Sequence, residues 1–209
     1  MLSANDLSCR RGERLLFSGI SFVVQPGELL HIRGANGSGK TSLLRLLCGL
    51  SVPESGEVLW HNRSPRTLGE VFLAAVTYLG HRNAIKDELS AMENIQMSAA
   101  LDGHRISGDD AYAALAMMGL SEKVDLQTKV LSQGQRRRVA LARLCLSGSS
   151  LWLLDEPLAA LDTEGVTLVE TLLDTHLSRG GLAVVTTHQP LNVRAGLTRH
   201  MHLESLEPA

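Results

Sequence analysis

Apolar residues recur in short, strand-like runs through the first part of the chain. ISFVV (20–24) is one such run, and LLHIR (29–33) follows a turn-forming QPGE stretch. TSLLRLLCGL (41–50) instead carries its leucines at helical spacing, and GEVLW (56–60) returns to a strand-like pattern. The pattern therefore predicts a β-rich N-terminal lobe that leads into one α/β unit.

The pattern changes to helices alone between about residues 84 and 148. Ser90 and Glu93 fit an S-x-x-E capping box, and DDAYAALAMM (109–118) is rich in the helix former alanine. A third helix begins within VLSQGQRRRVALARL (130–144). We therefore expect a helical insertion in this part of the chain.

Two apolar runs follow the insertion. LWLLD (151–155) and LAVVTT (182–187) lack polar alternation, which is typical of strands buried on both faces of a parallel sheet. An amphipathic helix is expected between them, over about 165–177, ended by Gly180 and Gly181. The predicted fold class is α/β, with a mainly parallel sheet, an N-terminal antiparallel β lobe and a helical insertion.

We expect one domain over residues 1–209. Residues 1–83 and 149–209 would form the α/β core with its β lobe, and 84–148 the helical subdomain. The longest apolar run, VFLAAVTYLG (71–80), is shorter than the roughly 20 residues of a membrane-spanning helix. We expect at best a buried strand there.

Composition argues against several classes of protein. The 20 basic and 22 acidic residues give a formal net charge of -2, so the chain has no overall attraction to polyanions, and no nucleic-acid partner is expected. Cys9, Cys48 and Cys145 are odd in number and form no C-x-x-C pair, which argues against a disulfide framework and a zinc site. A reducing compartment is expected.

GANGSGKT (34–41) is the strongest chemical motif, because it matches G-x-x-x-x-G-K-[ST] in full between a predicted strand and a predicted helix. Its glycines leave backbone N–H groups free to surround the phosphates of ATP. Lys40 would reach the β- and γ-phosphates, and the Thr41 hydroxyl would ligate Mg²⁺. The alternative is a glycine-rich turn that spells the motif by chance. The expected ATP-binding residues of this loop are Gly34, Ala35, Asn36, Gly37, Ser38, Gly39, Lys40 and Thr41.

Polar residues follow two apolar strands at their C-terminal ends, where ligands gather in open α/β sheets. Asp155 fits the carboxylate on the magnesium side, and Glu156 fits the base that orients and deprotonates the attacking water. Alone, such a pair is more often a solvated loop or a helix cap, but the phosphate loop reverses that preference. His188 ends the next strand, where a γ-phosphate contact would lie, although a lone histidine is usually a core or surface residue.

A second stretch has the character of an anion site. Ser132 and Gln135 fit an S-x-x-Q capping box, and Gly134 lets the backbone approach a ligand closely. This LSQGQ stretch, followed by LWLLDEP, by A-L-D at 160–162 and by TTH, resembles the ATP-binding subunits of ABC transporters. The resemblance covers essentially the whole chain.

The resemblance implies a P-loop NTPase core with the ABC ATPase fold, and ATP hydrolysis. It also implies a second copy of the chain, stacked head to tail, whose ATP is closed over by this chain's signature motif. Ser132 and the Gly134 backbone would contact the partner's γ-phosphate, and Asp162 would link the two sites. The signature motif it assigns is Leu131, Ser132, Gln133, Gly134 and Gln135.

Arg136, Arg137 and Arg138 follow the signature directly. On a helix three consecutive side chains fan over about 200° and cannot all face one ligand. We therefore expect them on a solvated, partly interfacial face.

Further details resemble one branch of the family, the ATP-binding subunit of the cytochrome c maturation haem exporter. These are YLGH (78–81), LSQGQRRRVALARL (131–144) and TTHQPL (186–191). The branch implies a peripheral protein on the cytoplasmic face of the inner membrane, bound to membrane-spanning permease subunits. Haem is implied by the resemblance alone.

Two positions depart from the family pattern. Arg11 stands where many members place an aromatic residue that stacks on adenine; a guanidinium can also lie on the base, with a cation–π energy on the order of 0.5 to 2 kcal/mol. His81 or Arg82 occupies the place of the usual glutamine, whose magnesium contact therefore cannot be carried over.

Three other functions share some of these motifs. A DNA-repair ATPase of the same type needs a long coiled coil, for which the stretch from Lys40 to Ser132 is too short. A soluble ATPase of iron–sulfur cluster assembly remains as the alternative. A non-hydrolysing nucleotide-gated module is less favoured, because Glu156 and His188 are both present.

Overall fold

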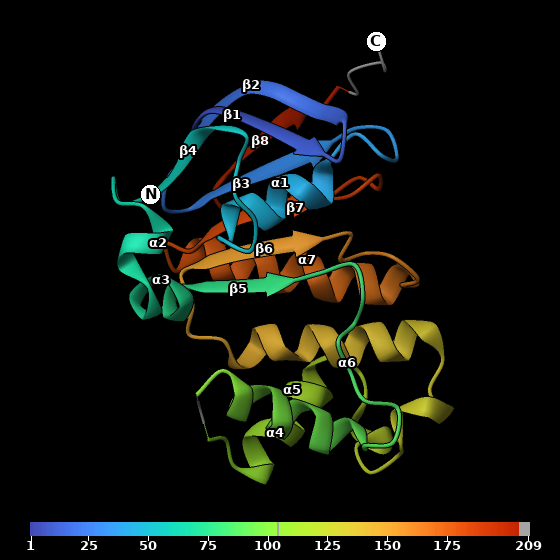
Figure 1. The fold of residues 1–209 in the computed structure, drawn as a ribbon. Coiled ribbons are helices and arrows are strands. Elements are labelled where there is room, and N and C mark those ends of the chain that lie inside the picture. The colour runs from blue at the N-terminus through green and yellow to red at the C-terminus, as the bar shows by residue number, and fades with distance from the viewer. Residues whose placement is uncertain (104, 205–209) are drawn as a thin grey trace. The chain divides into compact units, whose positions relative to one another are not determined.

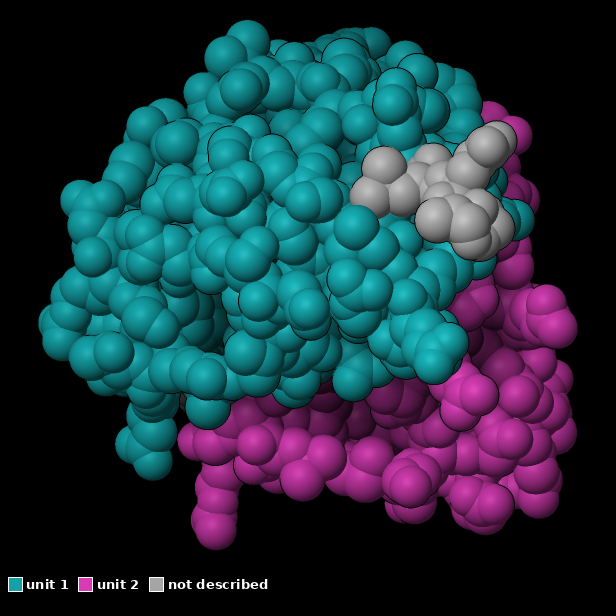
Figure 2. All heavy atoms as spheres, turned by 45° about the horizontal axis from the view of Figure 1, so that its top comes forward, with its two compact units in different colours: residues 1–78, 149–156, 173–209 teal, residues 79–148, 157–172 magenta. Residues whose placement is uncertain are grey.

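The computed structural model describes residues 1–103 and 105–204. The chain divides into two compact units, shown in different colours in Figure 2. Unit 1 holds residues 1–78, 149–156 and 173–209, and unit 2 holds residues 79–148 and 157–172. The segments that carry the expected motifs are therefore divided between the two units.

Unit 1 contains a three-stranded antiparallel sheet in the order β2-β1-β4 (Figure 1). β1 (Leu2–Arg11) and β2 (Arg14–Val24) are joined by a tight turn in which Gly12 has a φ of 60°, a conformation that suits glycine. β4 (Ser55–Trp60) pairs with the other side of β1. The expected antiparallel β lobe is confirmed.

The second sheet of unit 1 has the order β5-β6-β7-β3-β8. β6 and β7 pair in parallel, and β3 pairs in parallel with both β7 and β8. Every residue of β6 and β7 is buried, as their apolar runs predict. β8 could not be predicted from the sequence, because LTRHMH is an edge strand of mostly polar, exposed residues. The strands are β3 (Glu28–Arg33), β5 (Val76–Leu79), β6 (Leu151–Asp155), β7 (Leu182–Thr186) and β8 (Leu197–His202).

Two helices follow motif-bearing strands in the sequence, α1 after β3 and α7 after β6. α1 (Lys40–Leu47) begins immediately after the glycine-rich loop and buries Leu43, Leu44 and Leu47 in the core of unit 1. α7 (Thr163–Ser178) ends just before Gly180, which has a φ of 81°. Both helices were expected from their apolar spacing.

The expectation of a strand over 71–80 is wrong for its first half. The run begins as α3 (Glu70–Ala75), which follows the short helix α2 (Pro65–Leu68), and only then becomes β5. Phe72 is buried while Val71 and Leu73 are exposed, so the segment presents one apolar side chain inward. A continuous apolar run does not reveal this difference by itself.

Unit 2 is helical. Serine N-caps with complete capping boxes begin three of its helices, at Ser90, Ser107 and Ser132. The side chain of Asn94 bonds to the backbone of Lys86 and to Ser90 O, which ties the entry loop to the first helix. The helices are α4 (Ala91–Leu101), α5 (Gly108–Met117) and α6 (Gln133–Leu146), with 3₁₀ turns η1 (Ser121–Lys123) and η2 (Thr128–Val130).

Among the residues that the structure describes, no helix combines the length and apolar character needed to cross a membrane. Cys9, Cys48 and Cys145 are free thiols.

Candidate functional site: a phosphate loop and a signature pocket

The phosphate loop lies between the end of β3 and the start of α1 in unit 1. Two of its glycines are required by close contacts. A Cβ on Gly34 would lie 2.4 Å from the carbonyl oxygen of Leu203, and one on Gly39, whose φ is 100°, would lie 2.9 Å from the Phe17 ring. A side chain at either position would push the loop off the sheet. The glycines therefore set how closely the loop packs against its own unit.

Lys40 lies within the loop rather than in solvent. Its ammonium donates to the carbonyl oxygens of Gly34 (2.7 Å) and Ala35 (3.2 Å), and lies 3.1 Å from Nε2 of His188. The residue is only 8% exposed. The charge is thus already held at the centre of the loop, where phosphate oxygens could take the place of the carbonyl acceptors.

Ser38 adds an unusual hydroxyl to the same loop. Its Oγ is buried and has no hydrogen-bond partner among the described residues. A buried polar group without a partner costs about 1–3 kcal/mol. A phosphate oxygen would satisfy it, so the loop fits an anionic ligand on grounds independent of the motif.

Asp155 and Thr41 supply hard oxygen ligands at the end of β6. The Thr41 hydroxyl donates to Oδ2 of Asp155 (2.7 Å), and the Thr186 hydroxyl donates to Oδ1 (2.8 Å). The carboxylate is buried and oriented on both oxygens. Burial first, and then this carboxylate, raise the pKa of Tyr78 to about 12. The oxygen donors suit Mg²⁺, and the residues present fit that ion.

Glu156 has a strained backbone, with a φ of 48°. Its N–H donates to the carbonyl oxygen (2.8 Å) and to the hydroxyl (3.2 Å) of Thr186, which hold the residue in this conformation. Its carboxylate lies 3.5 Å from Nε2 of His188. The same nitrogen lies 3.1 Å from Oδ1 of Asn36. The carboxylate and the imidazole therefore face the loop together.

The expected residues Lys40, Thr41, Asp155, Glu156 and His188 are thus brought together in unit 1. Thr186 was missed as the residue that orients Asp155 and Glu156. A signal was available, because Asp155 and Thr186 occupy matching positions at the ends of two apolar strands that pair in parallel.

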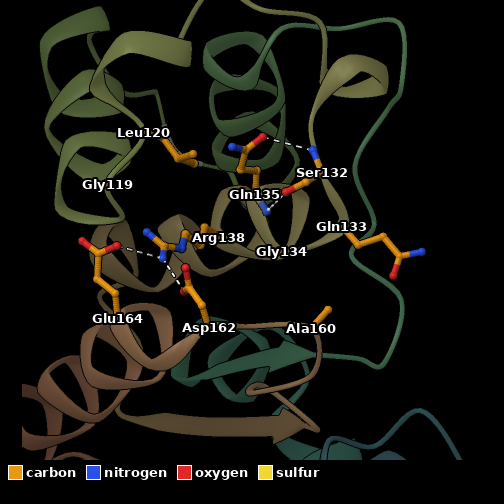
Figure 3. Close-up of a pocket in the computed structure, with 10 residues that line it drawn as sticks. All are labelled: Gly119, Leu120, Ser132, Gln133, Gly134, Gln135, Arg138, Ala160, Asp162 and Glu164. Atoms are coloured by element: carbon orange, nitrogen blue, oxygen red, sulfur yellow. Dashed lines mark hydrogen bonds and ion pairs between the residues drawn. The ribbon is translucent and has the colours of Figure 1, made fainter.

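Ser132, Gln133, Gly134 and Gln135 line a pocket of about 630 Å³ in unit 2 (Figure 3), whereas Leu131, the first residue of the signature motif, is buried and is not part of the lining. Ser132 and Gln135 exchange hydrogen bonds between side chain and backbone, at 3.0 and 3.2 Å, as the capping box predicts. A Cβ on Gly134 would lie 2.7 Å from the carbonyl oxygen of Ala160, so this glycine also permits close packing within the chain. The pocket is lined by Gly119, Leu120, Ser132, Gln133, Gly134, Gln135, Arg138, Ala160, Asp162 and Glu164.

The expectation that the three arginines lie on a solvated face is wrong for two of them. Arg137 and Arg138 are only 2% and 8% exposed, whereas Arg136 is partly exposed and pairs with Asp87. A charged side chain is buried only when its donors are paired. Composition does not show the partners, because they lie far away in the sequence.

Arg138 pairs with the aspartate of the A-L-D motif and with the glutamate two residues after it. Its guanidinium donates to Asp162 (2.5 Å) and Glu164 (3.2 Å), as Figure 3 shows. Asp162 also accepts from the N–H of Gly165 (2.9 Å) at the start of α7. The Gly165 N–H, followed by Arg138, lowers the pKa of Asp162. Asp162 is thus fixed beside the signature helix.

Arg137 points to a different part of unit 2. It donates to the carbonyl oxygens of Pro157 (3.2 Å) and Gly80 (3.2 Å) and to Oδ1 of Asn83 (3.0 Å). His81 and Arg82, between two of these anchors, are exposed. Arg11 is also exposed. It lies at the end of β1, opposite Arg14 of β2 in the antiparallel sheet.

The family profile and the two curated relatives that follow are all of the ABC transporter type. The family profile described as ABC transporter matches residues 17–159. The chain is 51% identical over 97% of its length to the cytochrome c biogenesis ATP-binding export protein CcmA of Nitrosomonas europaea, of which it covers 95%. It is equally identical, again over 97% of its length, to the protein of that name from Dechloromonas aromatica, all of which it covers.

A likeness of fold is found with a solved structure, a dimeric ATP-binding cassette in a post-hydrolysis state bound to ADP and Pi. The TM-score is 0.85 at 24% identity, over 99% of this chain and 97% of that one.

Proposed function

The chain belongs to the ABC transporter family, and on that premise we propose that it is the ATP-hydrolysing subunit of the haem exporter of cytochrome c biogenesis. The observation that carries the ATPase part is the grouping of Lys40, Thr41, Asp155, Glu156 and His188 around one phosphate loop. The export part rests on the relatives named as cytochrome c biogenesis export proteins.

Residues of the loop and Asp155 contribute separately to the binding of ATP and its metal ion. Lys40 and the loop N–H groups bind the β- and γ-phosphates, and the unpaired Ser38 hydroxyl donates to a phosphate oxygen. Thr41 and Asp155 would hold Mg²⁺, which would supply positive charge to the phosphates when bound.

Glu156 and His188 act at the γ-phosphate. The Glu156 carboxylate orients a water and accepts its proton as the water attacks phosphorus, and the bond to the ADP oxygen breaks. His188 bonds to a γ-phosphate oxygen through Nε2, the nitrogen that here lies near Asn36, Lys40 and Glu156. The fixed backbone of Glu156 keeps the base in place.

The signature pocket serves a second copy of the chain. Ser132 and Gly134, at the N-terminus of α6, would contact the γ-phosphate held by the partner's loop, since a helix N-terminus favours anions. Two copies would therefore enclose two ATP molecules, with membrane-spanning permease subunits as further partners at the cytoplasmic face of the inner membrane.

Glu156→Gln tests the catalytic assignment. The variant keeps the size of the side chain but cannot accept a proton, so it should bind ATP, fail to hydrolyse it and accumulate as a dimer. Size-exclusion chromatography with ATP and Mg²⁺ and a phosphate-release assay measure both. Glu122→Gln, on an exposed turn of unit 2, is the matched control. Hydrolysis by Glu156→Gln at the wild-type rate would rule out Glu156 as the base.

The export part is tested in cells that lack the native gene. Complementation should restore cytochrome c, and mild detergent extraction should recover permease subunits with the chain. Recovery of iron–sulfur assembly proteins instead would favour the alternative function.

A further inference from the structure

The loop over residues 80–83 has an unusual anchor. Gly80 offers its carbonyl oxygen, and Asn83 its side-chain oxygen, to the same nitrogen of Arg137, at 3.2 and 3.0 Å. His81 and Arg82 lie exposed between these anchors. The backbone around the two residues is therefore held at both of its ends by one guanidinium.

The second arm of that guanidinium reaches a different segment. Nε of Arg137 donates to the carbonyl oxygen of Pro157, at 3.2 Å. Pro157 follows Glu156 directly in the sequence, and its ring restricts the backbone there. A bond to this carbonyl therefore restricts the backbone directly after Glu156, the proposed base.

Burial makes these bonds consequential. Arg137 is 2% exposed, and its charge is stabilised by acceptors of the protein rather than by water. The planar guanidinium presents its donors in a fixed fork, so it constrains the relative positions of the acceptors more tightly than a lysine could. If the 80–83 loop moves, either these hydrogen bonds break or Arg137 moves with the loop.

We propose that Arg137 is a positioning residue for ATP hydrolysis, which fastens the 80–83 loop and the residue after Glu156 to the signature helix α6. This inference rests on the proposed ATPase function. The acceptors described above, on Gly80, Asn83 and Pro157, belong to the same unit as Arg137.

The test compares four single variants and one double variant of the full chain, each purified with the membrane proteins that remain bound to it. Arg137→Met keeps an unbranched apolar stem of similar course but removes the donors, and Asn83→Ala removes one acceptor. Asn83→Asp keeps an acceptor at that position. Arg143→Met is the control. It removes another guanidinium from the same helix, and that guanidinium pairs with Asp102.

We expect Arg137→Met to lower kcat about tenfold, the scale of a misplaced catalytic group, and to leave the KM for ATP within about twofold. Asn83→Ala should lower kcat less, and Asn83→Asp should retain it. In the double variant Arg137→Met with Asn83→Ala, kcat should equal that of Arg137→Met alone, because both changes remove the same bond. Arg143→Met should retain kcat.

The thermal midpoint of each variant separates positioning from folding. If Arg137→Met does not fold, the Asn83 pair carries the test alone. The inference is overturned if a folded Arg137→Met keeps the wild-type kcat, if the two single losses multiply in the double variant, or if Asn83→Asp loses as much as Asn83→Ala. Absence of ATP hydrolysis by the wild-type preparation would instead contradict the proposed function.

Discussion

Ser38 contributes a hydroxyl that the folded chain does not use. It is buried in the phosphate loop, while Lys40 beside it satisfies two carbonyl oxygens. The two residues therefore differ in what they do without ATP. Lys40 supports the loop and Ser38 does not, although both are expected to bind phosphate.

Ser38→Ala should accordingly separate stability from binding. Removal of an unpaired buried hydroxyl should leave the free energy of unfolding unchanged or raise it by about 1 kcal/mol, while ATP affinity falls. Lys40→Ala should lose ATP binding below detection. Thermal melting and nucleotide titration measure both quantities. A clear loss of stability in Ser38→Ala without ATP would show that the hydroxyl has a structural partner.

Functional residues that belong to short sequence motifs could be identified from the sequence. Residues whose burial depends on hydrogen-bond partners far away in the sequence could not. Lys40, Thr41 and Asp155 follow from short patterns next to apolar strands. The buried places of Arg137 and Arg138 depend on acceptors such as Pro157 O and Asp162, which come near only through tertiary structure. Three adjacent charges in a sequence give no signal of that difference.

At the scale of elements, the N-terminus of α6 is defined by a cap and by a contact. The Ser132–Gln135 capping box starts the helix, and Gly134 brings its first turn against the carbonyl oxygen of Ala160. Ala160 itself has a φ of 63°, an uncommon conformation for alanine. The signature pocket therefore depends on a close approach of two segments of unit 2.

Gly134→Ala should destabilise the protein, although alanine favours helices. The added Cβ meets an oxygen at 2.7 Å, and overpacking of this kind costs about 1–3 kcal/mol, which outweighs a helix-propensity gain of about 1 kcal/mol. Gly108→Ala, where a Cβ meets nothing within 4 Å at the start of α5, should be neutral or stabilising. Chemical denaturation of both variants gives the comparison. Equal stabilities would show that the α6 contact yields without strain.

The exposed pair His81 and Arg82 should act on partners rather than on metal. Arginine cannot coordinate a cation, and an imidazole nitrogen is a poor ligand for Mg²⁺, so alanine at either position should change Mg²⁺ affinity by less than about twofold, or roughly 0.4 kcal/mol. Cytochrome c formation in cells should still decrease. The Mg²⁺ dependence of ATPase activity checks the first point, with Asp155→Asn as the positive reference. A tenfold higher Mg²⁺ requirement in either variant would place that residue at the metal.

Elements with an apolar run or a helix cap of unambiguous type can be predicted from the sequence, whereas a polar edge strand and a helix within a continuous apolar run cannot. β6, β7 and α6 have long apolar patterns or caps, whereas β8 is polar and is a strand because β3 offers it a free edge. The helix α3 was mistaken for a strand because its apolar run has no polar interruption.

At the scale of the whole molecule, two histidines, the buried His31 and the half-buried His176, make stability depend on pH. His31 lies within β3 and bonds to the carbonyl oxygen of Thr187 (3.0 Å), and His176 stacks on Trp152 with ring centroids 3.9 Å apart. Burial lowers the pKa of both imidazoles. Both are therefore neutral in the fold at pH values where they would be protonated in the unfolded chain.

The free energy of unfolding should consequently fall as pH decreases below about 6.5, the ordinary pKa of histidine. Between that value and the lower pKa of the folded state, the unfolded chain binds more protons, so acid favours it. His176→Phe keeps a ring on Trp152 but cannot be protonated, and should lose less stability than wild type between pH 7.5 and 5.5. Urea titrations at the two pH values give the difference, with His202→Gln as the control for an exposed histidine. An unchanged difference in His176→Phe would exclude this histidine as a source.

The sheet order also bears on how the protein is made. β3 ends in the phosphate loop, but both of its neighbours, β7 and β8, are translated after the helices of unit 2 and after Asp155, and the Leu203 carbonyl that packs over Gly34 is translated later still. The residues of the phosphate loop are therefore translated long before the strands that stabilise its conformation. Competence to bind ATP is therefore expected only after Leu203 has been translated, and chains that are released before that point lack the contact at Gly34.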